Sequence, residues 1–236
     1  MASNQTFSIE YIATLATSTK LSPHILVELL ADLEATAITI PLTEQTTDLI
    51  STYYSAFLLS LLLIDDVNEA RFLSKRISSH LAHTLPSQRP TPVSDLTAYP
   101  LIPPTYNLLK AVYTRSYSSI YNTLLSTPWS PELQPLASMF LEHFRRKTFK
   151  LLSYAYTTIT PSQAATYLGF QNESEQVVLQ KLMAEGWVWD GDQGLLKTVA
   201  KEDDEDDVGG VISQAKGGND GRIERLTGLV THLTEV

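Results

Sequence analysis

Hydrophobic residues along the first third of the chain recur mostly at helical spacing. Residues 7–16 follow a mainly helical pattern, and Ser22 followed by Pro23 is typical of a helix start. The apolar stripe after Pro23 predicts a helix to about Glu34. A nearly continuous apolar run, Tyr53–Ile64, comes next. A membrane span needs about twenty such residues, so this shorter run predicts a central helix that its neighbours bury.

The next segment has two chemically different faces. Asp65 or Asp66 is the expected cap of this helix. One face is apolar and expected to be buried, and the other is charged and expected to face solvent. The apolar face consists of Ala70, Phe72, Leu73, Ile77 and Leu81, and the charged face of Glu69, Arg71, Lys75 and Arg76. Four helices in pairs are typical of a helical repeat stack.

A proline-rich stretch interrupts this pattern at residues 84–104. It holds six of the twelve prolines and few residues to bury, which predicts an exposed loop. Helical spacing resumes over residues 108–125. Trp129–Glu132 then predicts the start of a long helix that ends near Tyr156.

Residues 160–199 have the pattern of a small module with marked ends. Thr160 with Gln163 has the spacing of a capping box, and Gly169 is a predicted helix end. Asn172 predicts the cap of a second helix, which runs to about Gly186. Trp187–Trp189, a turn at Asp190–Gly194 and a return strand at Leu195–Val199 predict a hairpin. Two helices followed by a hairpin are typical of a winged helix.

Winged helices commonly bind DNA through their second helix, but the charges here disfavour that partner. The second helix and the hairpin turn carry mainly carboxylates, which would repel phosphates. These residues are Glu173, Glu175, Glu185, Asp190 and Asp192, against the one cation Lys181. The whole chain has a formal net charge of -9. We therefore expect neither nucleic acid nor a membrane as the partner, although a nucleic-acid-binding winged helix is retained as an alternative.

Composition and motifs also argue against an enzyme. The chain of 236 residues has no Cys, which excludes a disulfide framework, a thiolate zinc site and a cysteine nucleophile. His80 and His83 share a helix face, but two ligands do not make a metal site. Asp203–Asp207 lacks the ligand spacing of a calcium-binding EF-hand loop. We expect no catalytic residue, cofactor, metal or small-molecule substrate.

The C-terminal part divides into a linker and a short helix. Residues 200–221 are acidic and then Gly-rich, which is typical of a flexible linker. Residues 222–236 carry an apolar seam formed by Ile223, Leu226, Val230 and Leu233. A helix this short is marginal alone, so we expect it to dock on a partner or to fold back on its own domain.

One basic run, Arg145-Arg146-Lys147, is a candidate charged surface. Phe144 and Phe149 lie beside it, so a solvated helix face is the default interpretation. An ion-pair contact with an acidic neighbouring subunit is the alternative.

Several segments together resemble a family of small assembly subunits. They are Asp66-Val67-Asn68-Glu69-Ala70-Arg71-Phe72-Leu73, Lys75-Arg76-Ile77, Trp129-Ser130-Pro131-Glu132-Leu133-Gln134-Pro135, Arg145-Arg146-Lys147-Thr148-Phe149 and Ala155-Tyr156-Thr157-Thr158-Ile159. These residues are similar to the PCI-domain family of COP signalosome subunit eight, which has relatives in the proteasome lid and in translation initiation factor three. The resemblance covers roughly Leu49–Val199.

The resemblance implies a mainly α-helical fold and a non-catalytic scaffold role. A TPR-like helical-repeat part, residues 1–159, would join the winged helix, residues 160–199, in one PCI domain. The signalosome removes Nedd8 from cullins of cullin-RING ubiquitin ligases through a metalloprotease subunit whose His-x-His pair is absent here. The two alternatives within the family are a subunit of the proteasome lid and one of initiation factor three.

Three contact surfaces follow from this interpretation: the helical-repeat face, the winged-helix sheet edge and the C-terminal helix. The sheet-edge residues are Trp187, Val188, Trp189, Leu195 and Leu196. The resemblance implies signalosome subunit three as the neighbour at that edge. It also implies a bundle with the C-terminal helices of further subunits. The N-terminus lacks the features of a signal peptide, so we expect an intracellular protein of the cytoplasm and nucleus.

Overall fold

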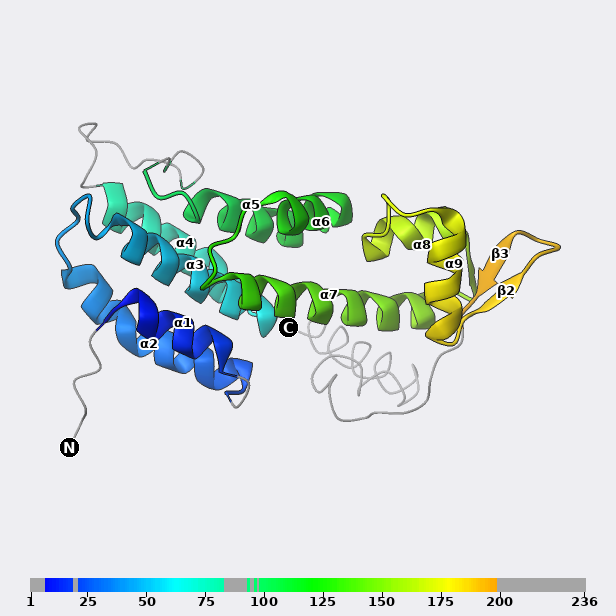
Figure 1. Ribbon diagram of the computed structural model, residues 1–236, viewed down its shortest axis with the longest axis horizontal. Helices are drawn as coiled ribbons and strands as arrows, with labels where there is room; N and C mark the ends of the chain where they lie inside the picture. The colour runs from blue at the N-terminus through cyan, green and yellow to red at the C-terminus, as the bar shows by residue number, and fades with distance from the viewer. Residues whose placement is uncertain (1–6, 19–20, 83–92, 94–95, 97, 199–236) are drawn as a thin grey trace, which may run out of the picture. The chain divides into compact units, whose positions relative to one another are not determined.

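A helix with no exposed side lies at the centre of the helical part. In the computed structural model the run Tyr53–Ile64 falls mainly in helix α3, Thr47–Leu63 (Figure 1). Every residue from Ile50 to Leu63 is buried, because α1, α2, α4, α5 and α7 all contact this helix. The predicted central helix is therefore confirmed. None of the described helices is long and apolar enough to cross a membrane.

The structure describes residues 7–18, 21–82, 93, 96 and 98–198, which belong to one compact unit, residues 1–199. They are mainly helical with a small antiparallel sheet, as predicted. The linker at 200–221 and the helix at 222–236 lie outside the described residues. The remaining elements are α1 Ile9–Thr17, α2 Pro23–Thr39, α4 Val67–Ala82, α5 Ile102–Tyr113, α6 Tyr117–Ser126, α7 Gln134–Ala155, β1 Thr158–Ile159, α8 Pro161–Leu168, α9 Glu175–Ala184, β2 Val188–Asp190 and β3 Leu195–Lys197.

Side-chain caps begin three helices at the residues that the sequence indicated. The Ser22 hydroxyl accepts a hydrogen bond from the Ile25 N–H at 3.4 Å, and the Asp66 carboxylate accepts one from the Glu69 N–H at 2.9 Å. The Thr160 hydroxyl accepts one from Gln163 at 3.3 Å. Each bond satisfies an N–H that has no partner within its own helix.

Other element boundaries differ from the prediction. Helix α2 continues past Glu34 to Thr39, where Ala37 is still fully buried. Helix α7 begins at Gln134, because the Ser130 carbonyl accepts hydrogen bonds from Leu133 and Gln134 and so closes a turn before the helix. The N-cap of α9 is Ser174 rather than Asn172. The return strand β3 is also shorter than predicted and ends at Lys197.

Polar groups of α3 are satisfied inside the core. The Tyr53 hydroxyl donates to the Leu30 carbonyl at 2.7 Å, and the Tyr54 hydroxyl lies 2.8 Å from Nδ1 of His80. Burial, which disfavours the charged phenolate, raises the pKa of both tyrosines. These bonds orient α3 against α2 and α4 and remove the cost of burying two hydroxyl groups.

The end of the proline-rich stretch does not lie in an exposed loop. Pro103 and Pro104 fall in the first turn of α5, where an absent N–H breaks no hydrogen bond. Leu96 and Tyr99 are buried in the main core. The Leu101 N–H donates to the Ser51 hydroxyl of α3 at 3.1 Å. The last part of the stretch is therefore attached to the central helix, while residues 83–92 lie outside the described part.

Helix α7 takes part in two hydrophobic clusters. Its first half, through Leu136 and Phe140, packs in the core around α3. Its second half contributes Leu152 to the cluster of the winged helix, with Ile159 of β1 and Leu168 of α8. Figure 1 shows the helix passing from α3 to α8. Residues before 160 therefore contribute to the core and the sheet of the winged helix.

The buried face of α4 is narrower than the sequence indicated. Ala70, Leu73, Ile77 and Leu81 are fully buried as predicted, but the Phe72 side chain is 56% exposed. The expectation for Phe72 is wrong, because its position on the helix turns the ring toward solvent. The Lys75 ammonium lies 5.6 Å from its centre.

The adjacent residues Leu73 and Phe72 provide a test of this assignment. Leu73→Ala removes a buried side chain and is expected to lower the free energy of unfolding by about 2–5 kcal/mol. Phe72→Ala removes an exposed ring and is expected to change it by less than about 0.5 kcal/mol. Urea unfolding of both variants measures the difference, and equal losses would contradict the assignment.

Gly169 provides a second test, at the contact between α6 and α8. It takes a left-handed φ of 73° at the end of α8, and an added Cβ would overlap the buried Tyr121 ring. Gly194 has a similar φ of 65° but open space around it. Gly194→Ala should cost about 1–2 kcal/mol for the backbone alone. Gly169→Ala should cost about 1–3 kcal/mol more because of the overlap, as measured by thermal or urea unfolding.

Candidate interaction surfaces of the winged helix

The winged-helix sheet has three strands in the order β1-β3-β2. Strand β1, which the sequence did not reveal, pairs with β3 through Thr158–Lys197 and Ile159–Leu196. Strand β2 pairs with the other side of β3. The prediction that the return strand has a free edge is therefore wrong, because β3 is the central strand. The outer strands are β1 and β2, and within the described part of the chain β2 pairs with no strand on its other side.

The five predicted sheet-edge residues fall into different environments. Trp187 precedes β2 and is buried: its ring stacks on Phe149 at 4.8 Å, and its N–H donates to the Ser153 hydroxyl at 2.9 Å. Leu196 is fully buried. Both side chains belong to the core of the winged helix. The prediction that they form contacts at the sheet edge is therefore wrong. Trp189 and Leu195 are half-buried, and Val188 is 54% exposed.

The wing turn is closed by its own carboxylate. Oδ1 of Asp190 accepts hydrogen bonds from the backbone N–H groups of Asp192 and Gln193. Oδ2 of Asp190 forms an ion pair with Lys197 at 2.8 Å. The hydrogen bond from Lys197, followed by that from Gln193, lowers the pKa of Asp190. These bonds hold the turn in place and tie β2 to β3.

The basic run of α7 does not form one surface. Arg145 donates to the carbonyls of Leu168 at 3.0 Å and Gly169 at 3.4 Å, so it caps the end of α8. Lys147 forms an ion pair with Asp65 at 2.7 Å on another side of the helix. Partial burial alone would raise the pKa of Asp65, but His143, whose Nε2 lies 3.7 Å from Oδ2, and the ion pair with Lys147 hold it below its usual value. Only Arg146 is exposed without an ion pair to another described residue.

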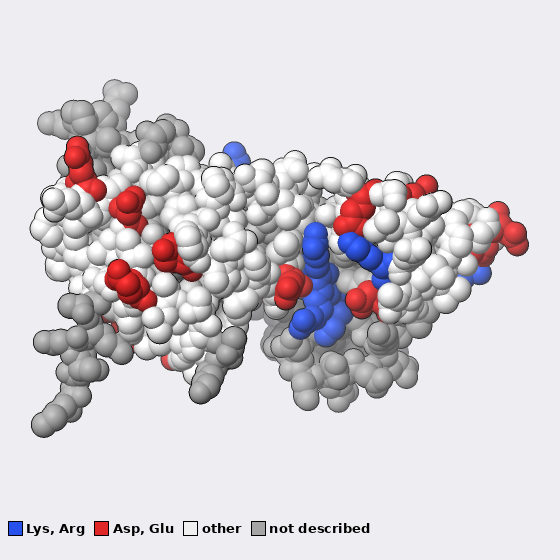
Figure 2. All heavy atoms as spheres, in the orientation of Figure 1, with Lys and Arg blue, Asp and Glu red and all other residues white. Residues whose placement is uncertain are grey.

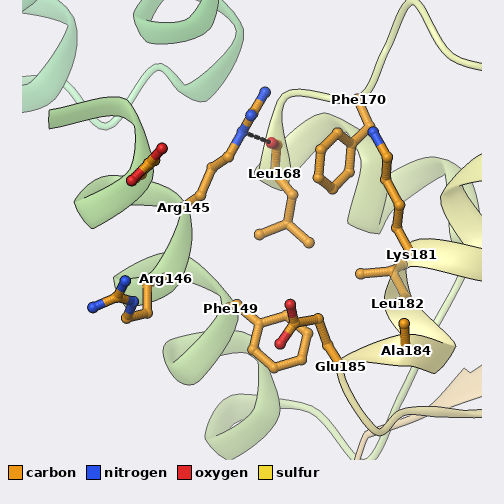
Figure 3. Close-up of a pocket in the computed structure, with 10 residues that line it drawn as sticks. Arg145, Arg146, Phe149, Leu168, Phe170, Lys181, Leu182, Ala184 and Glu185 are labelled. Carbon is orange, nitrogen blue, oxygen red and sulfur yellow. Dashed lines mark hydrogen bonds between the residues drawn. The ribbon is translucent and has the colours of Figure 1, made fainter. Parts of the chain in front are cut away.

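A groove of about 500 Å³ lies between α7 and α9, beside the end of α8 (Figure 3). Its apolar base includes Phe149, Leu168 and Leu182, whose side chains converge on the open centre in Figure 3. Its rim is charged. The lining residues are Glu142, Arg145, Arg146, Phe149, Leu168, Phe170, Lys181, Leu182, Ala184 and Glu185.

Two cations meet on one ring at the end of this groove. The Arg145 guanidinium lies 4.9 Å, and the Lys181 ammonium 4.7 Å, from the centre of the Phe170 ring. Figure 2 shows Lys and Arg side chains gathered over α7, with Asp and Glu side chains on either side. No pattern in the sequence indicated this groove, because its walls come from three elements that only the fold brings together.

The residues considered as metal ligands do not come together as a metal site in the described part of the chain. The His80 ring is hydrogen-bonded to the Tyr54 hydroxyl, and His83 lies outside the described residues. Within residues 7–18, 21–82, 93, 96 and 98–198, no three His, Asp or Glu side chains are arranged to hold a metal ion. The Asp203–Asp207 run and the seam residues Ile223, Leu226, Val230 and Leu233 lie beyond the described part.

Comparisons with a family model and with individual proteins point to the same family. The model of the CSN8/PSMD8/EIF3K family matches residues 48–207, from α3 through the end of the winged helix. The chain is 35% identical over 150 residues to COP9 signalosome complex subunit 8 of Emericella nidulans, covering 63% of this chain and 64% of that protein. The match therefore spans slightly less than two thirds of that relative's length.

Two more distant relatives carry the same name. COP9 signalosome complex subunit 8 of Arabidopsis thaliana is 25% identical over 180 residues, covering 76% of this chain and 78% of that protein. The subunit of Danio rerio is 27% identical over 134 residues, covering 57% and 61% respectively. These matches confirm the resemblance found in the sequence. The family match covers about two thirds of the chain and includes helices of the stack as well as the winged helix. The chain therefore belongs to the CSN8/PSMD8/EIF3K family.

Proposed function

We propose that this chain is a non-catalytic assembly subunit of the COP9 signalosome. The observation that carries the proposal is the similarity to signalosome subunit 8 of three organisms, within a family match that covers helices and winged helix together. The complex removes Nedd8 from cullins, as the resemblance implies. We assign that cleavage to the metalloprotease subunit and assembly to this chain.

The first proposed contact is strand addition at β2. Its outer side has no partner strand among the described residues, and the wing hydrogen bonds of Asp190 keep the strand in place. A neighbouring PCI subunit would continue the sheet through backbone hydrogen bonds. Signalosome subunit three is the neighbour that the resemblance implies. Val188 is the exposed side chain that such a strand would meet.

The second proposed contact is the C-terminal helix, which rests on the sequence alone. Its seam of Ile223, Leu226, Val230 and Leu233 presents one apolar face. In the complex this face would join the C-terminal helices of further subunits. We further propose that the protein acts in the cytoplasm and nucleus. The proteasome lid and initiation factor three are the alternatives within the same family.

Val188→Lys tests the sheet edge. A Lys on β2 places a charge where the added strand would pack, so incorporation into the complex should fall while the isolated chain keeps its stability within about 0.5 kcal/mol. Val177→Lys on α9 is the control, since Val177 is also an exposed valine of the winged helix but does not lie in the sheet. Quantitative co-purification of a tagged chain measures both, and an equal effect of the two changes would contradict the contact.

The double change Leu226→Asp with Val230→Asp tests the C-terminal helix and the identity of the complex. Each buried aliphatic side chain is worth about 1.5–3 kcal/mol before the costs of binding are subtracted, so incorporation should be lost. His232→Asp, off the seam, should have little effect. Mass spectrometry of the co-purifying proteins is the measurement. Unchanged recovery would contradict the helix contact, and recovery of proteasome or ribosomal proteins would contradict the signalosome proposal.

A further inference from the structure

Two aromatic side chains are exposed to solvent on the contacting helices α4 and α5. Phe72 of α4 and Tyr113 at the end of α5 are each more than half exposed. The Arg71 guanidinium of α4 lies 4.5 Å from the centre of the Tyr113 ring, so the first turns of α4 lie beside the end of α5. Aromatic and Arg side chains are enriched in protein interfaces. These residues therefore mark a candidate interaction surface.

Four cations accompany the two rings. All four are exposed, and none forms an ion pair with another residue in the described part of the chain. Two lie on α4, one lies on the last turn of α5, and one lies in the turn that follows α5. They are Arg71, Lys75, Lys110 and Arg115. Together with Phe72 and Tyr113, they form what we call the α4–α5 patch.

The neighbouring carboxylates do not cancel the charge of the patch. Glu69 on α4 and Glu34 on α2 both pair with a fifth cation, Arg76, at 2.9 Å and 2.7 Å. Asp66 accepts the N–H of Glu69 at the start of α4. Counting all three carboxylates against the five cations still leaves an excess of positive charge. On a chain with a net charge of -9, this local excess attracts acidic groups.

Two cations of the patch lie against its rings. Arg71 lies over the Tyr113 ring, and the Lys75 ammonium lies 5.6 Å from the centre of the Phe72 ring. The attraction between a cation and a ring face favours these positions. A partner would therefore meet apolar and cationic groups at the same place. Such a surface selects a segment that carries both carboxylates and an apolar side chain.

We propose that the α4–α5 patch binds an acidic segment of a partner protein. The carboxylates of the segment would face the four cations, and an apolar side chain would pack on the exposed rings of Phe72 and Tyr113. The inference does not depend on the signalosome proposal, since the binding is a property of the isolated chain.

An acidic protein segment fits the patch better than a nucleic acid does. Base stacking needs a free ring face, and one face of each ring already has a cation of the chain itself over it. A continuous phosphate backbone would also extend beyond the patch. It would then be repelled by the carboxylates of Glu34, Asp66 and Glu69, whereas a short segment need not reach them.

The test is binding of a peptide to the full chain, measured by fluorescence anisotropy. The probe is a short fluorescein-labelled peptide of Asp, Glu and Leu residues. Two companion peptides have Ser in place of Leu, or Lys in place of the acidic residues. The acidic peptide with Leu should bind, and both companions should bind at least about tenfold more weakly, since each lacks one of the two contacts.

Two variants, each with a matched control, locate the site. Lys75→Glu reverses a cation of the patch and should weaken binding by about tenfold, whereas Arg146→Glu, an exposed cation on α7, should leave affinity within about twofold. Phe72→Ala removes an exposed ring and should weaken binding by about fivefold or more. Ile38→Ala removes an exposed side chain of α2 and is the control for it. Circular dichroism checks that every variant remains folded.

Four results would overturn the proposal. The first is no binding by the unchanged full chain, and the second is unchanged affinity in both Lys75→Glu and Phe72→Ala. The third is an equal loss in the control variants, or equally tight binding of a single-stranded RNA, either of which would indicate that the patch does not select an acidic protein segment. The fourth is binding that appears only after the acidic residues 202–207 are changed to Asn and Gln, which would assign the patch to the chain's own segment.

Discussion

The burial of α3 on every side is the constraint on which the helical part depends. A helix with apolar residues around its whole circumference cannot remain in water, so other helices must cover each of its faces. Five helices do so, and the last of them, α7, is long enough to continue beyond the core. The same helix then supplies Leu152 to the winged helix. The two parts of the unit are therefore joined by a shared element rather than by a loop.

The contacts around α8 strengthen this junction. Arg145 of α7 caps the end of α8, and the Tyr121 hydroxyl of α6 donates to the Tyr167 carbonyl at 3.0 Å. Gly169 allows the Tyr121 ring to approach the backbone closely. Because α6 and α7 both hold α8, the orientation of the β2 edge and of the α7–α9 groove is linked to the helical core. That linkage suits a protein whose proposed role is to connect subunits.

The proposed contacts differ in chemistry. Strand addition at β2 depends mainly on backbone hydrogen bonds, whereas the α4–α5 patch combines exposed rings with cations. The terminal seam depends on the burial of aliphatic side chains. Because the proposed contacts rely on different interactions, each of them can be tested by a change that leaves the others in place.

Much of the fold was predictable because local chemistry determines it. Ser22, Asp66 and Thr160 cap helices within a few residues of themselves, and the Tyr53–Ile64 run specifies a buried helix by its composition alone. The two-residue strand β1 was not predictable, because it is defined only by its pairing with β3, nearly forty residues later in the chain. Likewise, only the tertiary structure turned Trp187 and Leu196 into core residues and made Arg145 a helix cap. The sequence by itself determined where helices begin and which stretch must be buried; the packing of distant elements decided which strand lies at the centre of the sheet and where a groove forms, since those depend on contacts between residues far apart in the chain.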